Sequence, residues 1–101
     1  MKRETSPVTA TVVIVLDGDT DAGYQLARIL LAEGRRVAAV ARHPGDAVRV
    51  MHGHPADRVM VIAADTADQR QWGLVIERVM DRFGRIDTVV RAEDTALRAS
   101  A

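Results

Sequence analysis

The apolar positions of this chain gather in four short runs separated by polar or periodic segments. The first run, Val8–Leu16, is a near-continuous series of β-branched and apolar residues, which is typical of a strand buried on both faces of a parallel sheet. Three shorter runs follow at Arg36–Ala41, Val59–Ala64 and Ile86–Val90. We expect each of the four runs to form a strand.

Helical periodicity fills the intervals between these runs. From Asp21 to Glu33 apolar residues recur at roughly helical spacing, and Gly34 stands where a glycine commonly ends a helix. A clearer amphipathic stripe occupies Trp72–Phe83 and stops at Gly84. The pattern over Asp46–His52 is weaker and predicts only a short helix.

The regular alternation of strand and helix, with short connections, indicates right-handed β-α-β crossovers and a parallel sheet. We therefore predict an α/β fold, a Rossmann-like three-layer half-domain with a four-stranded parallel sheet. We expect helices on both faces of this sheet. Residues 8–94 form the predicted module, between a flexible N-terminal tail at 1–7 and a short C-terminal stub at 95–101.

Composition narrows the function classes. With 101 residues there is room for one small domain. The fourteen basic and fourteen acidic residues cancel, so we expect neither nucleic acid nor a membrane surface as a partner. Because cysteine is absent, disulfides, a thiol nucleophile and thiolate metal ligands are excluded. These features lead us to expect a cytoplasmic protein.

The turn at residues 17–21 carries three aspartates directly after the first strand. Clustered carboxylates suit Mg²⁺, so a Mg²⁺- or nucleotide-binding sensor is one hypothesis. The interpretation we favour is a solvated turn whose aspartates cap the next helix and complement its dipole. His52 and His54 lie in a Gly/Pro loop with no cysteine and no clear carboxylate partner, so we assign no metal site.

The ordered motifs resemble the short-chain dehydrogenase/reductase family. That family follows its first strand with Thr-Gly-x-x-x-Gly-x-Gly, and here Asp17, Asp21 and Gly23 stand at the three glycine positions. By resemblance, Arg42 after the second strand would meet the 2′-phosphate of NADP. Asp65 after the third strand would contact adenine. These five residues are the candidate cofactor-binding positions of a degenerate site.

Further along the chain, Phe83-Gly84-Arg85-Ile86-Asp87 matches the family's Phe-Gly-x-Ile/Leu-Asp closely. Arg91-Ala92-Glu93-Asp94 departs from the family's Asn-Asn-Ala-Gly. Of the three turn glycines only Gly23 is kept, the one whose place in the family's turn allows close helix–strand packing. The resemblance therefore implies a retained Rossmann-like fold, with the strand order 3-2-1-4, and an altered phosphate-binding turn at residues 17–21. We expect no bound cofactor, and NADP is the alternative that Arg42 suggests.

The resemblance also implies a catalytic tyrosine with a lysine four residues later, together with a serine and an asparagine. The single tyrosine, Tyr24, is followed four residues later by Arg28. The single lysine is Lys2, and asparagine does not occur in the chain. We therefore assign no catalytic residue and do not expect enzymatic activity from this chain alone.

Three functions remain open at this point. The favoured one is a non-catalytic module: a scaffold, a regulatory or interaction protein, or the remnant of a reductase. The alternatives are a fragment of an NAD(P)-dependent short-chain oxidoreductase completed by another chain, and the Mg²⁺/nucleotide sensor. The fourth predicted strand, Ile86–Val90, is apolar and contains neither lysine nor proline. We expect self-association, or binding of a protein partner, through the edge of this strand.

Overall fold

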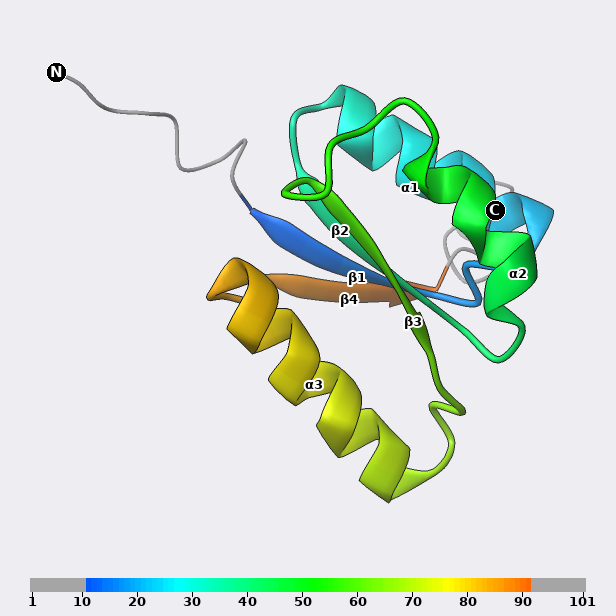
Figure 1. The fold of residues 1–101 in the computed structure, drawn as a ribbon, viewed down its shortest axis with the longest axis vertical. Helices are drawn as coiled ribbons and strands as arrows, with labels where there is room; N and C mark the ends of the chain where they lie inside the picture. The colour runs from blue at the N-terminus through cyan, green and yellow to red at the C-terminus, as the bar shows by residue number, and fades with distance from the viewer. Residues whose placement is uncertain (1–10, 92–101) are drawn as a thin grey trace, which may run out of the picture.

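The structure, a computed structural model, describes residues 11–91 of the chain (Figure 1). The expected terminal segments at 1–7 and 95–101 lie outside the described residues, as do residues 8–10 of the first predicted strand and 92–94 of the predicted module. In the described part no helix is both long and apolar enough to cross a bilayer. The elements in chain order are β1 (Val12–Leu16), α1 (Asp21–Ala32), β2 (Arg36–Ala41), α2 (Pro44–Ala47), the 3₁₀ helix η1 (Val48–Met51), β3 (Val59–Ala63), α3 (Gln69–Phe83) and β4 (Thr88–Arg91).

The four strands form one parallel sheet in the order β3-β2-β1-β4, which confirms the predicted topology. β1 lies between β2 and β4, with Val13 aligned to Val37 on one side and to Thr88 on the other. Each crossover carries a helix from the carboxyl end of one strand to the amino end of the next (Figure 1). The carboxyl ends of all four strands therefore meet at one edge of the sheet.

Helix α3 covers one face of the sheet. Successive side chains of a strand point to opposite faces, so alternate residues of the apolar strands meet this helix. Trp72, near the start of α3, is half-buried against this α3-side cluster. The buried members are Val12, Ile14, Ala38, Val40, Met60, Ile62, Val75, Val79 and Phe83.

Helix α1 and η1 cover the opposite face, which confirms helices on both sides of the sheet (Figure 1). Tyr24 is half-buried against this α1-side cluster. Its buried members are Val13, Val15, Ala27, Leu31, Val37, Ala39, Val50 and Val59. Because β1 and β2 are buried on both faces, their sequences lack the polar alternation of a half-exposed strand.

Where the predicted ends lie within the described residues, element boundaries differ from the predicted ones by up to three residues. α3 begins at Gln69 rather than Trp72, because the Asp68 carboxylate accepts hydrogen bonds from the backbone N–H groups of the first turn. β4 begins at Thr88 rather than Ile86, and Ile86 packs against the α3-side cluster just before the strand. The weak Asp46–His52 helix is instead α2 followed by η1.

Candidate functional site

The turn from β1 into α1 is built by hydrogen bonds around one backbone carbonyl. The carbonyl oxygen of Asp17 accepts the N–H of Thr20 at 3.1 Å and its hydroxyl at 2.7 Å. The same hydroxyl oxygen accepts the N–H of Gly23 at 3.0 Å and so caps α1. Asp17 has φ 56°, a left-handed conformation that no other non-glycine residue in the described part of the chain adopts. Aspartate tolerates this region better than most residues, and glycine adopts it freely.

Two glycines let this turn lie against the sheet. A Cβ on Gly23 would lie 2.3 Å from the carbonyl oxygen of Asp17, so only glycine fits there without a backbone shift. A Cβ on Gly18 would lie 2.9 Å from the Cβ of Ala39 in β2. The motif comparison singled out Gly23 but not Gly18, whose close approach to β2 depends on a residue that is distant in sequence.

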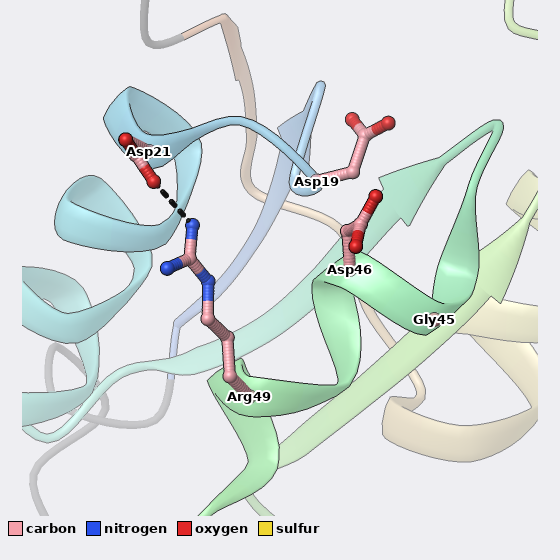
Figure 2. A pocket seen from close by; sticks show the side chains of 5 residues that line it. All are labelled: Asp19, Asp21, Gly45, Asp46 and Arg49. Atoms are coloured by element: carbon pink, nitrogen blue, oxygen red, sulfur yellow. Dashed lines mark hydrogen bonds and ion pairs between the residues drawn. The ribbon is translucent and has the colours of Figure 1, made fainter.

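Both aspartates at the family's glycine positions form ion pairs. The carboxylate of Asp17 pairs with the guanidinium of Arg91, the last residue of β4. The carboxylate of Asp21 pairs with Arg49 of η1 at 2.7 Å (Figure 2). Neither arginine was among the predicted site residues. Each arginine places a positive charge beside a turn whose own residues are acidic.

Arg49 also contacts the only tyrosine. Its guanidinium carbon lies 4.2 Å from the centroid of the Tyr24 ring, and that of Arg28 lies 5.6 Å from it. Guanidinium groups at such distances are attracted to the ring face. Together with the Asp21 ion pair, these contacts hold η1 against the first turns of α1. Tyr24 therefore contributes to packing at this junction.

A cavity of about 390 Å³ lies between the start of α1 and α2 (Figure 2). Asp19, Asp21 and Asp46 line it together with Arg49 and Gly45. In Figure 2 the Asp21 carboxylate is directed at Arg49. Within residues 11–91, however, no group of three or more histidine, aspartate or glutamate side chains is arranged so that it could hold a metal ion.

A second cavity, of about 270 Å³, lies beyond the carboxyl ends of β2 and β3. Arg42 and Asp65 line it with Ala63, Ala64 and Gln71. The backbone N–H of Asp65 donates to Gln71 Oε1 at 2.7 Å, which joins the end of β3 to α3. The structure thus brings Arg42 and Asp65 together, as their proposed roles at one nucleotide would require. Gln71 lies in no sequence motif that could have identified it as a residue of this cavity.

Asp87, whose carboxyl group has a lowered pKa, lies at the amino end of β1, opposite the two cavities. Arg85 donates two hydrogen bonds to Asp87, and the backbone N–H of Val12 donates a third. The Arg85 contact, followed by the Val12 hydrogen bond, lowers the pKa of Asp87, and the same pairing raises the pKa of Arg85. These groups stabilise the amino end of the sheet, away from the two cavities.

Comparison with known proteins identifies the family of this chain. A sequence profile described as short chain dehydrogenase matches residues 11–92. The chain belongs to the short chain dehydrogenase family. No curated protein sequence gives a significant match.

Solved short chain dehydrogenases share its fold. A short chain dehydrogenase from Bacillus anthracis is 22% identical with a TM-score of 0.77, over 85% of this chain and 36% of that one. One from Streptomyces avermitilis is 26% identical with a TM-score of 0.73, over 84% and 30%. A 3-ketoacyl-(acyl-carrier-protein) reductase from Brucella melitensis, complexed with NADH, is 22% identical with a TM-score of 0.73, over 78% and 32%. The chain thus spans about a third of the length of these short chain dehydrogenases.

The predicted site residues of this short chain dehydrogenase chain separate into two groups. Asp17, Asp21 and Gly23 lie together at the turn before α1. Arg42 and Asp65 lie at the cavity beyond β2 and β3. The charge partners of the first group, Arg49 and Arg91, come from η1 and β4 and were found only in the structure.

Proposed function

We propose that this short chain dehydrogenase chain acts as a non-catalytic module, serving as a scaffold, a regulatory or interaction subunit, or the remnant of a reductase. The observation that carries this proposal is the pairing of Asp17 with Arg91 and of Asp21 with Arg49. Both aspartates stand where the family places glycine. Side chains and their ion pairs therefore lie where the family's backbone approaches a pyrophosphate.

The geometry of the turn supports the proposal on steric grounds. A helix N-terminus attracts anions because its backbone N–H groups are free to donate. Here the hydroxyl of Thr20 already accepts the N–H of Gly23, and Asp17 adds a side chain at the first glycine position. Because two of the three carboxylates of the turn are neutralised by arginine, we expect the obstacle to a bound phosphate to be more steric than electrostatic.

The residue inventory supports the absence of catalysis by this chain. Asparagine is missing, Lys2 is the single lysine, and Tyr24 is the single tyrosine. Tyr24 packs against the α1-side cluster with Arg49 near its ring, in the role of a packing residue. A tyrosine acting as general acid or base would need a group nearby that tunes its pKa and a substrate within hydrogen-bond reach.

A second candidate function is a fragment of an NAD(P)-dependent oxidoreductase completed by another chain. The cavity lined by Arg42, Asp65 and Gln71 favours it, because it keeps a positive charge and hydrogen-bonding groups beyond the ends of β2 and β3. A ligand's adenosine 2′-phosphate would then meet Arg42, while the turn before α1 would supply little binding free energy.

The edge of β4 is our proposed interaction surface, for a second copy of the chain or for another protein. Among the described strands β4 pairs with β1 alone. Val89 aligns with Ile14 on the α3 side of the sheet, and it is 42% exposed. An apolar edge strand presents unpaired backbone donors and acceptors that another strand can meet.

A thermal-shift comparison with NADPH, NADH, ATP and Mg²⁺ tests these alternatives, because a ligand that binds the native state raises the melting temperature. The non-catalytic module predicts no shift with any of them and no turnover by homogeneous protein. A shift with NADPH that Arg42→Gln removes would favour the oxidoreductase fragment. An ATP shift that requires Mg²⁺ would favour the sensor, and in either case our proposal would be wrong.

A further inference from the structure

The sheet has a second outer strand, β3, on the side opposite β4 (Figure 1). Its sequence, Val-Met-Val-Ile-Ala, contains no charged residue and no proline. Charged side chains, prolines and bulges are the usual means by which proteins prevent an edge strand from pairing with another chain. β4, by comparison, ends in an arginine. β3 is therefore the less protected of the two edges of the described sheet.

The hydrogen bonds from β3 to β2 show which backbone groups of β3 face outward. The carbonyl of Arg58 and the N–H of Ala64, at the two ends of β3, are bonded to β2 at 2.9 and 3.0 Å. The backbone groups of successive residues in a strand point to opposite sides, so the even-numbered residues of β3 face β2. Val59, Val61 and Ala63 consequently direct their N–H and C=O groups to the outer edge, where they meet no other strand of the described sheet.

Helix α3 lies beside this edge and leaves two cavities along it. A cavity of about 360 Å³ is lined by Ile62 of β3 and by Leu74 and Arg78 of α3. Met60, Arg78 and Asp81 line another, of about 260 Å³. Leu74, Arg78 and Asp81 are separated by four and three positions, so they form one stripe of the helix. The stripe follows the β3 edge, and Arg78, which lines both cavities, lies level with the middle of the strand.

The two charged residues of this stripe have no charge partner in the described part of the chain. Arg78 and Asp81 are both exposed, and within residues 11–91 neither side chain forms an ion pair or a hydrogen bond. Their neighbour Arg82, by contrast, donates to the carbonyl of Ala56 at 2.7 Å. Leu74 is 53% exposed. The stripe thus presents one positive charge, one negative charge and one apolar side chain beside an unpaired strand.

This set of groups is self-complementary. In a two-fold symmetric interface both subunits use the same surface, so every contact between two different residues occurs twice. We propose that the β3 edge and the α3 stripe form a homodimer interface, in which β3 pairs antiparallel with β3 of a second copy. Val61 then lies opposite its own copy and Val59 lies opposite the partner's Ala63, which is the register that pairs the outward N–H and C=O groups. Arg78 meets the partner's Asp81 beside the joined strands.

The occupant of this edge follows from the charges. Any extended peptide could satisfy the backbone groups of β3, but a second copy supplies, by symmetry alone, a carboxylate for Arg78 and a guanidinium for Asp81. It also covers Leu74. The two sheets become one continuous sheet, and the interface lies on the opposite side of each sheet from the β4 edge.

The test is sedimentation velocity in the Val89→Lys background, which removes association through β4, and we expect a dimer at high micromolar concentration. Arg78→Glu places like charges opposite each other and should raise the dimer Kd by about tenfold, as should Asp81→Arg. Combining both substitutions exchanges the charges and should restore the Kd to within about threefold. Glu77→Arg, at an exposed position of α3 that lines neither cavity, is the matched control and should change the Kd by less than about twofold.

A monomer in the Val89→Lys background would overturn the proposal. A loss that the exchanged charges do not restore, or an equal loss from Glu77→Arg, would overturn it as well. Amide hydrogen exchange on the unsubstituted chain is a second measurement that depends on no variant. The outward N–H groups of Val61 and Ala63 should exchange about fivefold or more slowly at high than at low micromolar concentration, and unchanged rates would contradict the pairing.

Discussion

The carboxylate of Asp87 accepts the backbone N–H of Val12 at 2.8 Å, and the N–H of Asp87 donates in return to the carbonyl of Val12 at 2.9 Å. Asp87 immediately precedes β4, and Val12 is the first residue of β1. The reciprocal pair therefore joins the amino ends of two neighbouring strands. This gives the aspartate of the Phe-Gly-x-Ile-Asp motif a structural role in the sheet.

This contact predicts a specific dependence of stability on acid. Since Arg85 and Val12 lower the pKa of Asp87 below its ordinary value of 3.8, its contribution to stability is complete above that value. The contribution is lost as the pH falls through the lowered pKa. Asp87→Asn should lower the melting temperature at neutral pH and flatten its decline below about pH 4. Asp57→Asn, at an exposed loop aspartate, should leave the acid profile of wild type unchanged, and identical profiles for both variants would contradict the assignment.

Two glycine-to-alanine substitutions, one beside the turn before α1 and one in α3, should have opposite effects on stability. Gly23→Ala would place a Cβ 2.3 Å from the carbonyl oxygen of Asp17 and should cost about 2 kcal/mol or more of unfolding free energy. Gly73→Ala, at an exposed position in the second turn of α3, meets no atom within 4 Å and should gain up to about 1 kcal/mol of unfolding free energy. Urea denaturation measures both changes. Equal effects would show that the close approach at Gly23 is not maintained in solution.

The phosphate-binding turn at residues 17–21 leads us to predict that two substitutions can create NADPH binding. Wild type should bind NADPH no more tightly than about 1 mM, whereas Asp17→Gly with Asp21→Gly should gain about tenfold or more. Glycine removes both side chains, and it suits the φ of 56° at position 17. Adding Arg42→Gln should weaken NADPH while leaving NADH unchanged, because only NADPH carries the 2′-phosphate. Calorimetry on the three proteins decides between these outcomes, and sub-millimolar binding by wild type would contradict the prediction.

The exposed edge of β4 predicts self-association. Light scattering at high micromolar concentration should show species larger than a monomer, and Val89→Lys should shift them toward the monomer. Ile29→Lys is the control, since Ile29 is an apolar side chain of α1 that is 56% exposed, away from this edge. A clean monomer for wild type would contradict the prediction, as would equal responses to the two lysine substitutions.

The alternation of apolar runs and amphipathic stretches was sufficient to predict a parallel sheet covered by helices, whereas the strand order followed from the resemblance to the short chain dehydrogenases. The charge partners of the site could not be found in this way. Arg49 lies 28 residues from Asp21, and Arg91 lies 74 residues from Asp17. No local periodicity relates residues that far apart, and only the crossovers bring them together. The start of α3 at Gln69 was also missed, because it depends on the Asp68 side chain that caps the helix. Asp68 is polar and lies outside the amphipathic stripe from which the helix was predicted.

The two sides of the sheet each carry one intrinsic chromophore. Trp72 packs on the α3-side cluster, and Tyr24 packs on the α1-side cluster. The chain has no other tryptophan or tyrosine. Fluorescence excited selectively through tryptophan therefore reports on one layer alone, while the tyrosine contribution, obtained by subtracting the tryptophan signal, reports on the other. Non-coincident transitions of the two signals would reveal one layer loosening before the other, without any label.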